Sequence, residues 1–166
     1  MSDPITRPND LTTLLDLGLG GGHAVWGFRA AIVNHTDCAT LIHGFENIMS
    51  AYGRPALHSL SLLAQVLGAK GNRQLSLACP GCGVVTADEM SIVAVLAAEQ
   101  VGDDAESDAY LAWLMAGRGE REAKEAAHRV ASIFSAAHVP IDTPPIEITM
   151  PTKHLSNISF HAVGNA

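Results

Sequence analysis

Helical periodicity is the feature of this sequence that most constrains its fold. Between residues 38 and 52 the apolar side chains recur at the i, i+3, i+4, i+7 spacing that places them on one face of an α-helix. That face consists of Cys38, Leu41, Ile42, Phe45, Ile48, Met49 and Tyr52. The pattern predicts a helix that begins at a cap on Thr36 or Asp37, ends at Gly53 and buries its apolar face in a core.

Five further segments carry helical patterns and complete the predicted fold. They are residues 24–33, 55–68, 86–100, about 110–117 and 120–137. The segment 86–100 is apolar nearly all round and opens with the capping box Thr86-Ala87-Asp88-Glu89, so we place it at the centre of the core. In 24–33 the only charge is Arg29, and in 120–137 we expect the ion pairs Glu120–Lys124 and Glu125–Arg129 on the wet side. The fold class is therefore mainly α, a compact bundle of five to six helices with a short extended C-terminal segment.

Proline and glycine divide the chain into three expected parts. Residues 1–22 include the run Gly18-Leu19-Gly20-Gly21-Gly22 and are expected to form a flexible lead-in. Residues 23–138 make the helical domain, in which the acidic stretch 103–108 is expected to be a solvated loop. Residues 139–166 are rich in proline, which excludes helix, and alternate apolar with polar residues around 146–150. This last part is expected to be extended and to pack on the domain or on a partner subunit.

Composition and charge exclude several classes of function. The 166 residues suffice for one domain, and 48% of them are hydrophobic whereas only 16% are charged. A net charge of -7 opposes binding to nucleic acid, whose phosphates require clustered Lys and Arg. No apolar run approaches the roughly 18 residues of a membrane span. The start Met1-Ser2-Asp3-Pro4 does not resemble a secretory signal, so we expect a cytoplasmic protein whose three cysteines do not form disulfides.

The segment Cys79-Pro80-Gly81-Cys82-Gly83 resembles the C-P-x-C-G knuckle of rubredoxin-like and zinc-ribbon sites. The resemblance implies a tetrahedral zinc or iron site, which would need two more ligands. Cys38 and His35 would supply them as a Cys3His site, or an ion would be shared across a two-fold axis. The alternative is that Pro80 and Gly81 simply form a tight turn and that Cys38 fills the core. No cofactor other than this metal is expected.

Other candidate chemistry is weaker. Thiol–disulfide exchange is disfavoured because Cys79 and Cys82 precede the predicted helix instead of lying on its first turn, where the dipole would stabilise a thiolate. Glu125 and His128 match one Glu-x-x-His pair of a di-iron bundle, but their helical angle turns them toward water. The chain contains no G-x-S-x-G motif and no P-loop, so the sequence names no catalytic residue.

The order of several residues resembles a family of small bacterial helical proteins with no assigned activity. The resemblance covers about residues 24–115 and consists of Trp26, Arg29, Cys38, Leu41, Phe45, the turn Pro80-Gly81-Cys82, and Asp88-Glu89. It implies a helical fold and assigns no function. The low fraction of charged residues and the proline-rich tail, which is available to cross a dimer axis, lead us to expect a non-enzymatic helical protein that acts by self-association, as a homodimer, or by binding a protein partner. The alternatives are a small metal-binding protein that uses the knuckle, and an enzyme with an unrecognised pocket.

Overall fold

A computed structural model describes residues 12–144 and confirms the mainly α fold class. Within that range the chain forms six α-helices and two short 3-10 helices, and no strand apart from one isolated bridge. In chain order these elements are η1 (Leu14–Leu17), α1 (Gly18–Ile32), α2 (Ala39–Met49), η2 (Ser50–Tyr52), α3 (Gly53–Lys70), α4 (Ala87–Val101), α5 (Asp104–Met115) and α6 (Glu120–Ala136).

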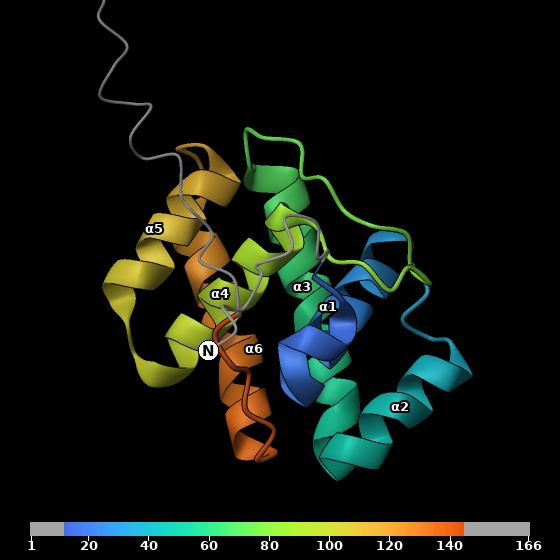
Figure 1. Cartoon of the computed structure of the whole chain (residues 1–166). Coiled ribbons are helices and arrows are strands. Elements are labelled where there is room, and N and C mark those ends of the chain that lie inside the picture. Colours follow the sequence, from blue (N-terminus) through green and yellow to red (C-terminus); the bar gives the residue numbers. More distant parts are fainter. Residues whose placement is uncertain (1–11, 145–166) are drawn as a thin grey trace, which may run out of the picture.

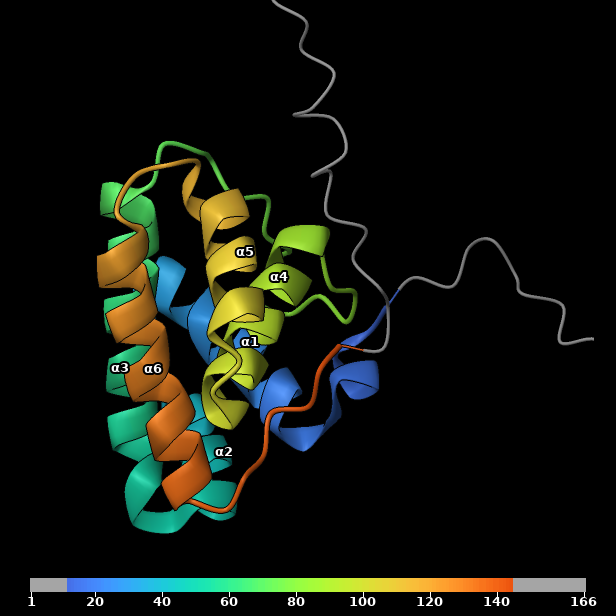
Figure 2. The same ribbon diagram turned by 90° about the vertical axis from the view of Figure 1, so that its left-hand side faces the viewer.

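The helices pack around α4 and along the long pair α3 and α6. Helix α3 lies beside α6, while α1 and α2 pack on α3, and α5 covers α4 (Figure 1). In the view turned by 90°, α3 and α6 lie side by side, and α5 lies between this pair and α4 (Figure 2). Helix α4 thus contacts α1, α5 and α6.

The central position of α4 was predicted from its sequence and is confirmed. Every residue from Asp88 to Ala98 is buried, so the helix has no solvent face over most of its length. Its N-terminus is closed by the expected capping box, in which Thr86 accepts from the amide of Glu89 at 3.1 Å and Glu89 accepts from the amide of Thr86 at 2.9 Å. Gly102 ends the helix in the left-handed conformation.

The glycine run predicted to be a flexible lead-in is instead the first half of α1. The helix begins at Gly18 and not near Ala24, and η1 precedes it, so the expected boundary at residue 22 is wrong. Packing explains the glycines, because a Cβ on Gly20 would fall inside the carbonyl group of Pro140. A Cβ on Gly27 would lie 2.7 Å from Leu60 Cδ1. The glycines thus let neighbouring segments approach the helix closely, which outweighs their poor helix propensity.

The acidic stretch 103–108 is also helical, contrary to the prediction of a loop. Asp103 caps α5 by accepting from the amide of Glu106 at 3.0 Å, and acidic residues in a first turn favour the positive end of the helix dipole. Lys124, which we expected to pair with Glu120 along α6, donates instead to Asp104 and Asp108 of α5 at 2.8 and 2.7 Å. The acidic residues therefore cap α5 and link it to α6.

The chain after α6 returns across the domain as far as the structure describes it. Val139 and Ile141 are buried, and the amide of Ile141 donates to Gln100 Oε1 of α4 at 2.9 Å. Residues 139–144 therefore pack on their own domain. The apolar alternation near residues 146–150 lies outside the described residues. Of the helices described here, none combines the length and hydropathy needed to cross a membrane.

Candidate functional site

The connection between α3 and α4 is long, irregular and held in place by the first turn of α4. Residues 71–86 form no helix or strand beyond the bridge at Val84, so their backbone polar groups need other partners. Thr86 donates its hydroxyl to the carbonyl of Ser76 at 2.7 Å. The carboxylates of Asp88 and Glu89 accept from the amides of Ser76 and Ala78 at 2.7 and 3.1 Å. The sequence Thr86-Ala87-Asp88-Glu89 thus caps its helix and anchors the connection.

A buried ion pair joins this connection to α1. Arg29 and Glu89 are each only 1% exposed, and the guanidinium binds the carboxylate through two bonds of 2.6 and 2.8 Å. Arg29 also donates to the backbone carbonyls of Cys82 at 2.6 Å and Val84 at 2.7 Å. The planar fork of arginine suits such a set of acceptors, which lysine could not satisfy together. Arg29, the one charge on α1, therefore ties two helices and the connection together.

Glu89 remains a carboxylate in this setting. Burial raises the pKa of Glu89, but the hydrogen bonds from Arg29 and from the backbone amide of Thr86, together with the charge of Arg29, outweigh it. The net effect is a lowered pKa, so Glu89 is ionised at neutral pH beside the guanidinium of Arg29. A permanently charged, fully bonded pair is suited to holding structure in place and offers no free proton donor or acceptor.

The far end of the connection is attached to α5 by Arg73. Its guanidinium forms an ion pair with Asp88, donates to the carbonyl of Trp113 at 3.2 Å, and lies 4.5 Å from the centre of the Trp113 ring. A cation over an aromatic face is attractive in this geometry. The connection is thus attached to α5 and α4 at one end and to α1 and α4 at the other.

Between these attachments lies a disulfide between Cys79 and Cys82. The expectation that the cysteines form no disulfide is therefore wrong, and the reason is the turn at Pro80 and Gly81, which brings the two Cα atoms to 5.2 Å. The amide of Cys82 donates to the carbonyl of Cys79 at 3.0 Å, as expected of a tight turn. Cys79 is exposed and Cys82 is half-buried.

The structure places the other two proposed metal ligands on the surface. Cys38 is the N-cap of α2 and is exposed, so the alternative that it fills the core is wrong. His35 is exposed in the turn before it. Within residues 12–144 no three His, Cys, Asp or Glu side chains come together as a metal site would require. Because thiolates and not disulfides bind zinc or iron, the metal hypothesis for Cys79 and Cys82 stays a prediction about the reduced chain.

Two further side chains named in the sequence analysis can be located. Glu125 and His128 are both exposed on α6, as expected from their helical angle. The Nδ1 atom of His128 lies 3.1 Å from Glu99 Oε2 on α4.

At Cys38, the backbone amides of Leu41 and Thr40 at the start of α2 lower the pKa of the thiol. Cys38 is therefore the free thiol with an environment that favours the thiolate.

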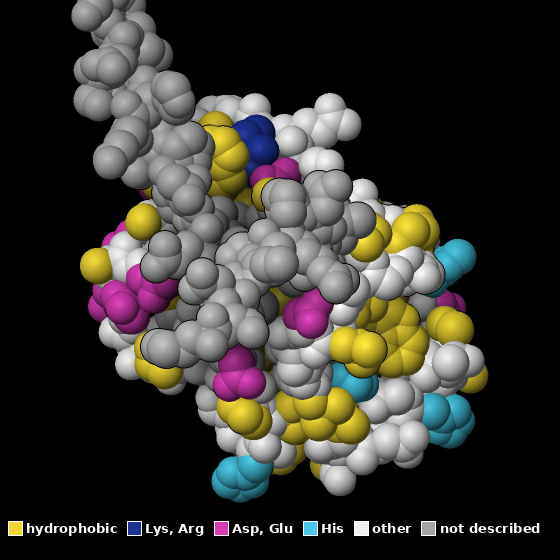
Figure 3. Space-filling model, in the orientation of Figure 1, with side chains coloured by type: hydrophobic (Ala, Val, Ile, Leu, Met, Phe, Trp, Pro, Cys, Tyr) yellow, Lys and Arg dark blue, Asp and Glu magenta, His cyan; other side chains and the backbone are white. Residues whose placement is uncertain are grey.

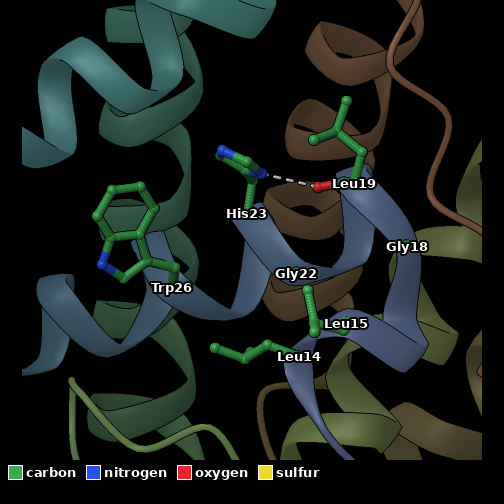
Figure 4. Close-up of a pocket in the computed structure, with 7 residues that line it drawn as sticks. All are labelled: Leu14, Leu15, Gly18, Leu19, Gly22, His23 and Trp26. Atoms are coloured by element: carbon green, nitrogen blue, oxygen red, sulfur yellow. Dashed lines mark hydrogen bonds between the residues drawn. The ribbon is translucent and has the colours of Figure 1, made fainter.

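An apolar groove opens where η1 meets α1, and sequence reasoning missed it. It has a volume of about 370 Å³ and is lined by Leu14, Leu15, Gly18, Leu19, Gly22, His23 and Trp26. Figure 4 shows His23 and Trp26 from α1 and Leu14 and Leu15 from η1 arranged around it. Leu15 is 91% exposed and Leu19 is 59% exposed, which is unusual for leucines so close together.

The groove has rigid walls. His23 is fixed through Nδ1 to the carbonyl of Leu19 at 2.9 Å, and its ring packs edge-on against Trp26 and the buried Phe45. Gly22 lets η1 approach, because a Cβ there would lie 3.0 Å from the carbonyl oxygen of Leu14.

The hydrophobic side chains around α1 form a visible patch on the face shown in Figure 3, with acidic side chains beside it.

One sequence signal could have revealed this site. Thr13 and Asp16 form a capping box ahead of η1, in which the Asp16 carboxylate accepts from the amide of Thr13 at 2.7 Å and from its hydroxyl at 2.8 Å. The spacing Thr-x-x-Asp before an apolar run marks a helix start. The glycines that follow conceal it, because a glycine-rich run usually indicates a loop.

No protein-family model, curated protein or solved structure matches this chain.

Proposed function

We propose that this protein acts through association at the apolar groove of η1 and α1, with a second copy of the chain as the partner. The observation that carries the proposal is the coincidence of two exposed leucines, Leu15 and Leu19, with a groove whose walls are apolar. Exposed apolar side chains beside a concave apolar surface are typical of protein interaction sites.

A second copy suits this surface because projection and hollow occur on the same patch. In a two-fold dimer each surface meets itself, so a leucine of one protomer is placed against the hollow of its partner and the reverse contact forms automatically. Here Leu15 and Leu19 project at the groove while Trp26 lines it. The groove region of one protomer therefore carries both the projecting leucines and the apolar hollow that a second copy would need. A stable dimer would bury about 800 Å² on each protomer, so contacts would extend beyond the groove.

The charge of the chain gives this association a defined salt dependence. Each copy carries a net charge of -7, and Asp16 is exposed beside the groove. Two copies repel each other, and added salt screens that repulsion while leaving apolar contacts intact or stronger. Association is therefore expected to strengthen as the salt concentration rises, which is opposite to the behaviour of a contact between unlike charges.

Sedimentation velocity over about a hundredfold range of protein concentration tests the proposal, because dimerisation depends on concentration. The test variant is Leu15→Asp, which places a charge at the groove and removes little from the core because Leu15 is 91% exposed. The matched control is Val101→Asp, since Val101 is 80% exposed at the end of α4 and does not line the groove. We expect the wild type and the control to dimerise and Leu15→Asp to remain a monomer. A wild type that stays monomeric throughout, or two variants that behave alike, would contradict the proposal.

A further inference from the structure

We propose that Cys79 and Cys82 form a reversible thiol–disulfide site that exchanges with a low-molecular-weight thiol at Cys79. Cys79 is exposed whereas Cys82 is half-buried, so an incoming thiol meets Cys79 first. The turn that carries the disulfide is also uncrowded, because a Cβ built on Gly81 or Gly83 would have no heavy atom within 4 Å. Neither cysteine lies on the first turn of a helix, which counts against an activated thiolate. Here, however, Cys79 is the sulfur that is attacked, and access to one sulfur in preference to the other is what directional exchange requires.

The contacts around the disulfide do not depend on it. On the Cys82 side, Arg29 donates to the carbonyls of Cys82 and Val84. On the Cys79 side, the amide of Ala78 donates to Glu89. Both anchors use backbone groups and buried side chains and involve neither sulfur, so reduction removes none of these bonds. The two sulfurs are therefore kept near each other after reduction, which favours closing the bond again.

Ring size points the same way. The disulfide joins residues only three apart in the sequence, and a bond that closes so short a loop removes less entropy from the unfolded chain than one that closes a long loop. Folding therefore gains less from it than from the disulfides that staple distant segments of small secreted domains. Because the bonds of Arg29 and Glu89 to the connection do not involve the sulfurs, the disulfide can open without loss of the fold.

The exchange takes place in two steps. A thiolate attacks the Cys79 sulfur, a new bond joins the two, and the Cys79–Cys82 bond breaks with its electron pair passing to the Cys82 sulfur, which takes up a proton. A second small-molecule thiolate then attacks the small-molecule sulfur of this mixed disulfide. The small-molecule disulfide forms, and Cys79 leaves as a thiolate that takes up a proton. Two thiols are oxidised to one disulfide, and the protein disulfide gains two electrons and two protons. The reverse sequence reoxidises the protein.

The first test measures reversibility in the full-length chain with Cys38→Ser, which removes the third thiol. The protein is equilibrated with mixtures of reduced and oxidised glutathione, quenched with acid, separated from glutathione, alkylated in denaturant at neutral pH and weighed by mass spectrometry. We expect zero, then two, added alkyl groups as the proportion of reduced glutathione increases, the same curve from either direction, and an unchanged circular dichroism spectrum. A disulfide that stays closed in reduced glutathione alone, or that reopens only with loss of the helical signal, would show a structural bond and overturn the proposal.

The second test identifies the sulfur that exchanges. In the same background, Cys82→Ser leaves Cys79 alone and Cys79→Ser leaves Cys82 alone, so each variant is the control for the other. With oxidised glutathione we expect the variant that keeps Cys79 to form its mixed disulfide at least about tenfold faster than the variant that keeps Cys82, because the Cys79 sulfur is more accessible. Equal rates, or faster reaction of Cys82, would contradict the assignment. One equivalent of zinc bound tightly by the reduced chain would show that the pair serves as a metal site, and would also overturn it.

Discussion

The buried pair of Arg29 and Glu89 makes the sharpest prediction about stability. Arg29→Met removes the charge but keeps an unbranched side chain of similar length, so the packing change is small. What remains is a carboxylate at Glu89 that is 1% exposed and has lost its two bonds to the guanidinium. The carbonyls of Cys82 and Val84 lose their bonds to Arg29 as well.

The expected cost is large. Removing one partner of a buried ion pair costs about 3–5 kcal/mol because the other charge is left without compensation. Each unsatisfied buried carbonyl adds about 1–3 kcal/mol, although Val84 is 39% exposed and water relieves part of that cost. Since a domain of this kind is stable by about 5–15 kcal/mol, we expect Arg29→Met to lose at least about 3 kcal/mol and to approach unfolding.

Urea unfolding followed by circular dichroism measures this change, provided that the m-value of the variant matches that of the wild type. The control is Arg54→Met, which removes an arginine paired with Glu46 on the surface, where the two side chains are 69% and 36% exposed. Surface pairs of this kind contribute about 0–1 kcal/mol. If the two variants differ by less than about 1 kcal/mol, the buried pair does not hold the connection as argued.

The same variant has a pH signature. Because the folded-state pKa of Glu89 is lowered, its stabilisation is fully present above the ordinary glutamate pKa of about 4.3 and is lost as the pH falls through the lowered value. Without Arg29, burial is opposed only by the remaining hydrogen bonds, and the pKa of Glu89 rises. Arg29→Met is therefore expected to unfold at a higher pH than Arg54→Met during acid titration. Coincident acid transitions would contradict this account.

Two further predictions concern α1 and α2. Gly20→Ala is expected to destabilise the fold by about 1–3 kcal/mol, because its methyl group would collide with the carbonyl of Pro140. The control Gly68→Ala, which has open space around it, should stabilise the fold by up to about 1 kcal/mol through helix propensity. Thermal unfolding compares the two variants, and a stabilised Gly20→Ala would refute the close approach of Pro140. Cys38 should be alkylated by iodoacetamide at neutral pH faster than an unstructured cysteine peptide, because its pKa is lowered; a rate equal to that of the peptide would show that the start of α2 does not act on the thiol.

Local patterns predicted the parts of the fold that local physics determines. Helix α4 was placed correctly because its capping box and its all-round apolarity are both visible within 15 residues. The helical pattern predicted over 120–137 was likewise confirmed as α6, whose inner face buries Ala123, Val130 and Phe134 completely. In these helices the sequence, the cap and the burial all agree, so one segment suffices to predict the outcome.

Two features escaped the local patterns because their partners are distant in the sequence. Gly20 belongs to a helix because residues 139–141 pass over it, and no local pattern contains that contact. Arg29 stood out as the one charge on an apolar helix, which demands buried acceptors, but its partner Glu89 lies 60 residues away. The prediction for residues 103–108 was wrong for a different reason, since acidic residues suit both a solvated loop and a helix N-terminus.

The ion pair and the groove are parts of one arrangement. The amide of Leu14 donates to the carbonyl of Gly83 at 2.9 Å, and the amide of Val85 donates to the carbonyl of Thr12 at 2.8 Å, which forms the bridge between Thr13 and Val84. The backbone to which η1 is attached is therefore the segment that Arg29 holds by the carbonyls of Cys82 and Val84. Because η1 supplies Leu14 and Leu15 of the groove, an ion pair whose side chains are only 1% exposed sets the position of this apolar surface.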